Sequence, residues 1–148
     1  MLNDNSPVLE AFPYLCARGA AAAIEFYVNV FEARVGLRLE ESSGRIAHAE
    51  FTIGPMTFMI ADEYPEVGIF SPSALGGTGL RIHLHVRNVD DLTSKAAMAG
   101  ATILLEPTDQ PHGERQSRVR DPFGHEWLLG QAIEDLTTEE IQQRFREW

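Results

Sequence analysis

The sequence predicts an α+β fold made of two copies of one β-α-β-β-β unit. The length of 148 residues suits a single domain, and 44% hydrophobic with 23% charged residues is typical of a globular chain. The same order of predicted elements occurs twice. Local matches at offsets of 67 to 70 residues support the repeat: Cys16-Ala17-Arg18 with His85-Val86-Arg87, Glu32-Ala33 with Ala99-Gly100, and Gly54 with Gly124. Such a repeat predicts two units whose sheets bury against each other or enclose a shared cleft.

The first unit is predicted over about residues 10–62. A helix is expected at 20–31 because alanine is the best helix former and Ile24, Tyr27 and Phe31 recur at helical spacing on one face. Proline presets one backbone angle and glycine permits unusual ones, so Gly54-Pro55 predicts a tight turn. The strands of this unit are predicted at 12–16, 35–39, 45–53 and 56–61.

The second unit, at about 80–130, follows a Gly/Pro/Ser-rich linker at about 63–79. Gly100 is the expected C-terminal cap of its helix, and a long polar loop is expected from Pro107 to Ser117. Its elements are predicted as a strand at 80–86, a helix at 89–99, and strands at 102–105, 118–120 and 126–129.

The tail is predicted to end in one further helix, over about 137–148. Thr137-Thr138-Glu139-Glu140 is a capping box, in which a hydroxyl and a carboxylate satisfy free backbone N–H groups. We expect this helix to have a structural role.

Charge and cysteine content exclude several classes of partner. Twelve Lys and Arg against 22 Asp and Glu give a net charge of −10, which disfavours nucleic acid and anionic membranes as partners. The single cysteine cannot form an internal disulfide, which fits a reducing cytoplasm. The first ten residues lack the pattern of a signal peptide, and no apolar stretch approaches the roughly 18 residues that span a bilayer. We therefore expect a cytoplasmic protein.

Several motifs resemble a known family. The motifs are Phe12-Pro13-Tyr14-Leu15, Ala23-Ile24-Glu25-Phe26-Tyr27, Arg45-Ile46-Ala47-His48-Ala49-Glu50, Leu84-His85-Val86, Arg118-Val119-Arg120-Asp121-Pro122-Phe123-Gly124-His125 and Glu134-Asp135-Leu136-Thr137. Together they resemble the vicinal oxygen chelate (VOC) superfamily of glyoxalases, bleomycin resistance proteins and dioxygenases, and within it the PhnB-like branch. The resemblance implies a single VOC domain over 1–148, a concave sheet forming a cup with helices outside, a small-molecule ligand and a homodimer.

The resemblance also implies where a metal would be held. Its metal-dependent members take one His or Glu ligand from the first and last strand of each unit. The matching positions here are Phe12, Met59, Arg81 and Leu128. Phenyl, guanidinium and isobutyl groups supply no usable lone pair, and a thioether is a poor ligand for hard divalent ions. The usual centre is therefore predicted to be absent, and no cofactor is predicted firmly, although a divalent metal at a shifted site remains an alternative.

Strand alternation predicts the residues that face the cup. In 81–86 the apolar side chains Ile82, Leu84 and Val86 share one face, so Arg81, His83 and His85 point the other way. The same rule turns His48, Glu50 and Glu126 inward, with Tyr14 and Cys16 on the parity of Phe12. The candidate ligand-binding residues are Tyr14, His48, Glu50, Arg81, His85, His112 and Arg115.

Two functions remain open at this point, and so does whether the protein is an enzyme. The first is binding of a small polar molecule without the usual metal. The second is a metal-dependent lyase, transferase or dioxygenase with a shifted site of His48, Glu50, His83 and His85, in which Glu126 and His83 are the candidate catalytic residues. All of these side chains could instead be ordinary hydrogen-bonded groups on a solvated sheet.

Three further residues leave alternatives of the same kind. Cys16 is either a nucleophile or, more in keeping with the lack of a nearby base, an inert thiol. Arg118 and Arg120 either recognise an anion or pair with acidic neighbours.

Overall fold

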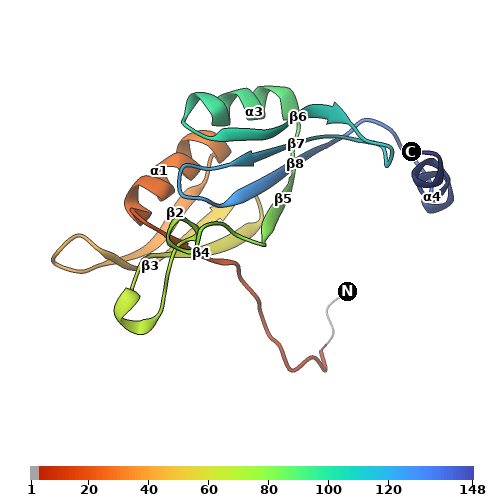
Figure 1. The fold of residues 1–148 in the computed structure, drawn as a ribbon. Helices are drawn as coiled ribbons and strands as arrows, with labels where there is room; N and C mark the ends of the chain where they lie inside the picture. Colours follow the sequence, from red (N-terminus) through yellow and green to blue (C-terminus); the bar gives the residue numbers. More distant parts are fainter. Residues whose placement is uncertain (1–3) are drawn as a thin grey trace.

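The computed structural model describes residues 4–148 and contains two four-stranded sheets, one from each half of the chain (Figure 1). The first sheet has the order β1-β4-β3-β2 and the second β5-β8-β7-β6, so the predicted α+β fold with a repeated β-α-β-β-β unit is confirmed. The elements are β1 Tyr14–Ala17, α1 Ala20–Phe31, β2 Arg34–Glu40, β3 Ile46–Ile53, β4 Met56–Asp62, η1 Pro65–Val67, α2 Pro72–Leu75, β5 Arg81–His85, α3 Val89–Met98, β6 Thr102–Asp109, β7 Glu114–Arg120, β8 Glu126–Ala132 and α4 Thr138–Glu147.

The helices begin and end largely where the sequence predicts. α1 ends as Glu32 takes a left-handed conformation with φ of 56°. The Asn88 side chain caps α3 by accepting a hydrogen bond from the Asp91 amide. Thr137 does the same for α4, accepting from the Glu140 amide as the capping box predicts. Within residues 4–148 no helix is both long enough and apolar enough to cross a membrane.

The second half departs from the prediction at its long polar loop. β6 continues to Asp109 and β7 already begins at Glu114, so most of the segment from Pro107 to Ser117 is strand. The prediction of a loop was wrong there because β7 is polar on both faces and shows no apolar alternation. Glu114, which was expected in the loop, is therefore the first residue of a strand. The linker likewise contains two short helices, η1 and α2.

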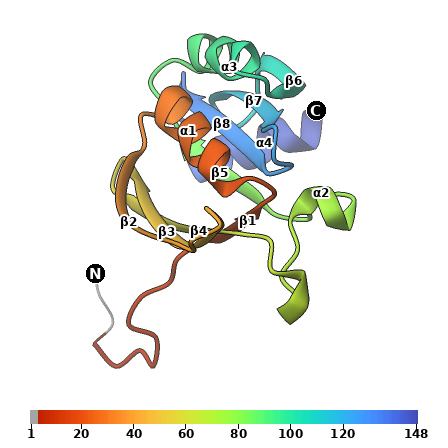
Figure 2. The same ribbon diagram turned by 90° about the vertical axis from the view of Figure 1, so that its left-hand side faces the viewer.

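The two halves meet through their helices and one tryptophan. Strands of different sheets do not pair, whereas α1 contacts α3 (Figure 2). The fully buried ring of Trp127 lies 4.8 to 5.9 Å, centroid to centroid, from the rings of Tyr27, Phe31 and Phe58. Asp121 Oδ2 accepts hydrogen bonds from Tyr27 Oη at 2.6 Å and from Trp127 Nε1 at 2.9 Å. The apolar faces of both sheets are thus buried at this junction.

The polar face of each sheet is left on the outside. Within one chain these two faces belong to sheets that do not pair, so they do not form one continuous cup. Each face carries the side chains that alternate with the core, such as His48 and Glu50 on β3 and His83 and His85 on β5.

Candidate functional site

The polar face of the first sheet holds a closed chain of hydrogen bonds. Tyr14 Oη lies 2.7 Å from His48 Nδ1, and His48 Nε2 lies 3.2 Å from Glu50 Oε2. A carboxylate only accepts hydrogen bonds, so Nε2 carries the hydrogen and Nδ1 accepts from the tyrosine hydroxyl. Burial raises the pKa of Tyr14, which keeps its hydroxyl protonated as a donor. Both ring nitrogens of His48 are thereby engaged within the sheet.

Cys16 shares this face, and its surroundings make it unreactive. Burial, with smaller contributions from the charges of Glu63 and Asp62, raises the pKa of its thiol to about 11. The thiolate is the nucleophilic form, so the structure favours the inert thiol over the nucleophile.

The polar face of the second sheet has an arginine-rich end. Arg81 on β5 and Arg120 on β7 flank Glu126 of β8 in the strand register, and Arg118 lies two residue pairs further along β7. The nearest nitrogens of Arg118 and Arg120 are 3.8 and 3.7 Å from the carboxylate oxygens of Glu126, too far for hydrogen bonds. Nε of Arg118 is buried and, among the described residues, has no hydrogen-bond partner. Three arginines and one carboxylate thus share this end of the face.

The other end of the same face gathers histidines around Glu114. The Nε2 atoms of His83 and His85 lie 3.8 and 3.6 Å from Oε1 of Glu114, and His112 Nε2 lies 3.2 Å from Oε2. Oε1 is buried and has no hydrogen-bond partner among the described residues. Burial lowers the pKa of His83 most strongly, opposed by the charge of Glu114 and assisted by His85 and His112, so its ring is held neutral. A cavity of about 580 Å³ opens beside these side chains.

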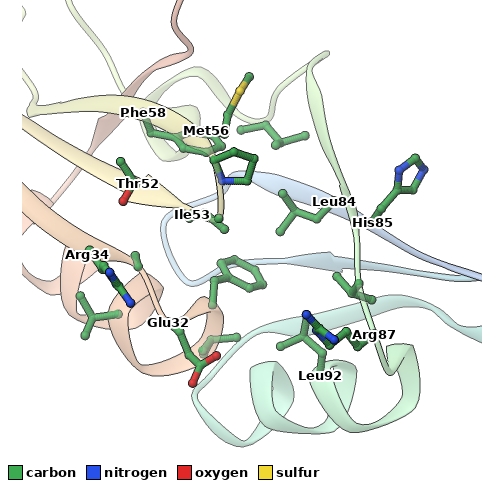
Figure 3. Close-up of a pocket in the computed structure, with 18 of the residues that line it drawn as sticks. Glu32, Arg34, Thr52, Ile53, Met56, Phe58, Leu84, His85, Arg87 and Leu92 are labelled. Atoms are coloured by element: carbon green, nitrogen blue, oxygen red, sulfur yellow. The ribbon is translucent and has the colours of Figure 1, made fainter.

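A larger groove lies where the two halves meet (Figure 3). It has a volume of about 1400 Å³ and lies between α1, the β3–β4 hairpin, β5 and α3. Its walls are mainly apolar, with Ile53, Phe58 and Leu84 among them. Leu84 and His85 both line the groove, and their side chains project from opposite sides of β5. Sequence reasoning did not find this groove because it depends on how the halves pack.

The structure brings only some of the predicted site residues together. His48 and Glu50 contact each other and Tyr14 in the first sheet, while His83 and His85 contact Glu114 in the second. Within residues 4–148, the side chains close enough to share a metal ion are His83, His85 and Glu114, so the four predicted metal ligands do not form one group.

The two candidates from the predicted loop, His112 and Arg115, also lie apart from each other. His112 lies in the turn before β7 and joins the cluster through Glu114. Arg115 points to the other face of β7, where it pairs with Asp90 and Asp109. Sequence reasoning missed Glu114, whose only signal was its place two residues after His112 in a segment taken for loop.

Comparisons with known proteins agree with this architecture. The profile of the Glyoxalase/Bleomycin resistance protein/Dioxygenase superfamily matches residues 11–129. Uncharacterized protein Mb0911c of Mycobacterium bovis is 40% identical over 133 residues, which cover 88% of each chain. TioX from Micromonospora sp. ML1 is 28% identical with a TM-score of 0.63, over 86% of this chain and 99% of TioX. The fosfomycin resistance protein FosX from Listeria monocytogenes, solved with Mn(II) and sulfate, shares the fold at 20% identity and a TM-score of 0.65, over 92% and 96%.

The protein is thus a small α+β protein of two repeated units, each with a polar sheet face. The chain belongs to the Glyoxalase/Bleomycin resistance protein/Dioxygenase superfamily.

The positions at which the resemblance implies metal ligands do not fit a metal here. Phe12 precedes β1 and is 39% exposed. Met59 is half-buried between Tyr14 and Glu50 in the register of the first sheet. Arg81 and Leu128 occupy the other two positions, on β5 and β8. None of the four supplies a good ligand for a divalent ion.

Proposed function

We propose that this protein binds a small polar molecule carrying an anionic group on the polar face of its second sheet, without the usual metal centre of the family. The observation that supports this most is the arginine-rich end of that face. Arg81, Arg118 and Arg120 outnumber Glu126 there, although the chain as a whole has a net charge of −10. A cluster of positive charge kept in an acidic protein favours an anionic ligand group.

Arg118 is the residue best placed to make the defining contact. A buried donor without a partner costs free energy, and an anion within reach would remove that cost. Guanidinium groups bind carboxylate and phosphate oxygens in a bidentate geometry. The ligand class is therefore a carboxylate, phosphate, phosphonate or sulfate ester of small size.

The experiment is a thermal-shift series with sodium phosphate, sulfate and citrate at constant ionic strength, with chloride as reference. An anion that binds the folded state raises the Tm with its concentration. We expect at least one of them to do so, and Arg118→Gln to abolish the shift. Arg38→Gln is the matched control, because Arg38 lies on β2 of the first sheet and pairs with Glu40. Equal shifts in both variants, or none in the native protein, would contradict the proposal.

A homodimer completes the binding site in this proposal. The polar faces of one chain do not enclose a ligand by themselves, and β2 is exposed along its length. Three apolar side chains of this edge strand, Val35, Leu37 and Leu39, are 45 to 50% exposed. An uncovered apolar edge strand favours association. Light scattering after size exclusion should give the mass of a dimer, and Leu37→Asp should give a monomer; a monomeric native protein would count against this part.

The alternative of a metal-dependent enzyme with catalytic Glu126 and His83 stays a prediction. Glu126 lies between arginines, and His83 lies on the neighbouring strand in register with Leu128. This arrangement favours holding an anion over shuttling a proton.

A further inference from the structure

We infer that His83, His85 and Glu114 form an open binding site for a divalent transition-metal ion of the Zn²⁺ class, away from the positions that the family uses. The site is built from three strands. His83 and His85 are alternate residues of β5, and Glu114 begins β7, with β8 lying between them in the sheet. The inference does not depend on the anion site, because the two use different residues.

The spacing of the three groups suits a shared ion better than hydrogen bonds. The imidazole Nε2 atoms lie 3.8 and 3.6 Å from Oε1 of Glu114, and all three candidate ligand atoms lie within 4.8 Å of one another. Hydrogen bonds between nitrogen and oxygen are about 2.7 to 3.2 Å long, so neither ring donates to Oε1. Two ligands at about 2.1 Å from a tetrahedral zinc ion are about 3.4 Å apart. The two nitrogen-to-oxygen separations are close to that value.

Glu114 presents an oxygen that nothing else uses. Oε1 is buried and has no hydrogen-bond partner among residues 4–148, while Oε2 lies 3.2 Å from His112. The ring of His112 in turn stacks on Phe145 of α4, with centroids 6.2 Å apart and planes at 13°. The hydrogen bond of His112 Nε2 is with Nε2 of Gln116, at 3.0 Å, so His112 lies beside Oε2 without a hydrogen bond to it. Among residues 4–148, Oε1 is thus an unpaired acceptor close to the two imidazoles of β5.

Gly130 makes the convergence possible. It lies on β8 opposite His85 and Gln116, in the interior of a strand, where glycine has a conformational cost. A Cβ at this position would overlap Oε1 of Glu114 and would lie 2.8 Å from Nε2 of His83. The missing side chain therefore leaves the space in which the imidazole and the carboxylate approach each other.

The donor set indicates the class of ion. Two imidazoles and one carboxylate are the ligands of open zinc sites and of some iron(II) sites, in which further positions remain for water or substrate. His85 is 78% exposed in its side chain, and the cavity of about 580 Å³ lies beside it, so an ion and its remaining ligands can enter. Calcium and magnesium prefer oxygen ligands and are not expected to bind.

The test is a zinc titration of untagged full-length protein in competition with a chromophoric chelator. We expect one Zn²⁺ per chain, and at least about tenfold weaker binding in His85→Ala and in Glu114→Gln. His48→Ala is the matched control, since His48 also faces a carboxylate but lies in the first sheet; its zinc affinity should equal that of the native protein. Cobalt(II) in place of zinc should give the intense visible absorption of a four-coordinate site, lost in the same two variants.

Gly130→Ala tests the geometry without removing any ligand. The atoms that its Cβ meets are the tips of flexible side chains, so the fold should persist, which far-ultraviolet circular dichroism checks. Zinc affinity should fall at least about tenfold because Glu114 and His83 are pushed apart. Absence of zinc binding by the native protein up to about 100 μM, or equal affinity in the native protein, Glu114→Gln and Gly130→Ala, would overturn the inference.

Discussion

The two halves of the molecule share one topology but differ in how their polar faces are satisfied. In the first sheet, Tyr14, His48 and Glu50 form a chain in which both ring nitrogens of His48 have a partner, at 2.7 and 3.2 Å. In the second sheet, Arg118 Nε and Glu114 Oε1 are buried without hydrogen-bond partners among the described residues. Native proteins leave few such groups unpaired unless something else binds them. The comparison teaches that the repeat supplies the scaffold twice, whereas the buried unpaired groups on which both proposals rest lie in the second sheet.

The largest expected effect is a loss of stability when the contact between the two halves is disrupted. Trp127 belongs to the second half but is fully buried against rings of the first. Trp127→Ala should lower the free energy of unfolding by about 3–5 kcal/mol, since a large side chain is lost from a packed core. Urea denaturation followed by circular dichroism measures this. The matched control is Trp148→Ala, where the ring is 79% exposed and a change below about 0.5 kcal/mol is expected. A loss of similar size in both variants would show that the halves do not depend on this contact.

The equivalent turn glycines of the two halves should differ in how much their replacement lowers the free energy of unfolding. Gly54 and Gly124 both have positive φ, at 55° and 94°. Alanine at Gly54 meets nothing within 4 Å, so Gly54→Ala should cost only the backbone strain of about 1–2 kcal/mol. A Cβ at Gly124 lies 2.9 Å from Cβ of Pro72 in α2, and Gly124→Ala should cost about 1–3 kcal/mol more. Thermal and urea unfolding of both variants test this; equal losses would mean that α2 does not pack firmly on the turn.

The smallest expected effect concerns the reactivity of the Cys16 thiol, on the polar face of the first sheet. With its pKa raised to about 11, Cys16 has little thiolate at pH 7, although a thiolate of high pKa is intrinsically more nucleophilic. Native protein should react with iodoacetamide at least about tenfold more slowly than urea-unfolded protein at pH 7. Its rate should keep rising with pH toward about 11 instead of levelling near 9. A fast reaction at pH 7 that levels near pH 9 would restore the nucleophile as a hypothesis.

Most of the fold could be predicted because its signals are local. Alanine content and spacing located α1 at its observed bounds, and the capping box at Thr137 located the start of α4. Alternation on β5 placed Ile82 and Leu84 on the core side and the two histidines on the other. The sequence does not show the irregularity in the pairing of β2 with β3, where the register shifts between Leu39 and Glu40. At this point Ile46 is buried and Ala47 is exposed, the reverse of what simple alternation predicts.

The site could be predicted only in part, because it depends on neighbours across strands. His83 and His85 carry a sequence signal as an i, i+2 pair, but their partner Glu114 lies on a polar strand with no apolar period. Gly130 gains its meaning only once its register with His85 and Gln116 is known. The separation of His48 and Glu50 from His83 and His85 follows from how the halves pack, which no single segment encodes.

The most direct test of the difference between the two faces is to follow the five histidine rings by long-range ¹H–¹⁵N nuclear magnetic resonance during a zinc titration. The second face should bind the ion, so signals of His83 and His85 should move with one equivalent of Zn²⁺, with a smaller change at His112. His48, bonded to Tyr14 and Glu50, and His125, which donates to the Cys16 carbonyl oxygen, should keep their shifts. Movement of His48 together with the pair on β5, or no movement of any ring, would contradict the account.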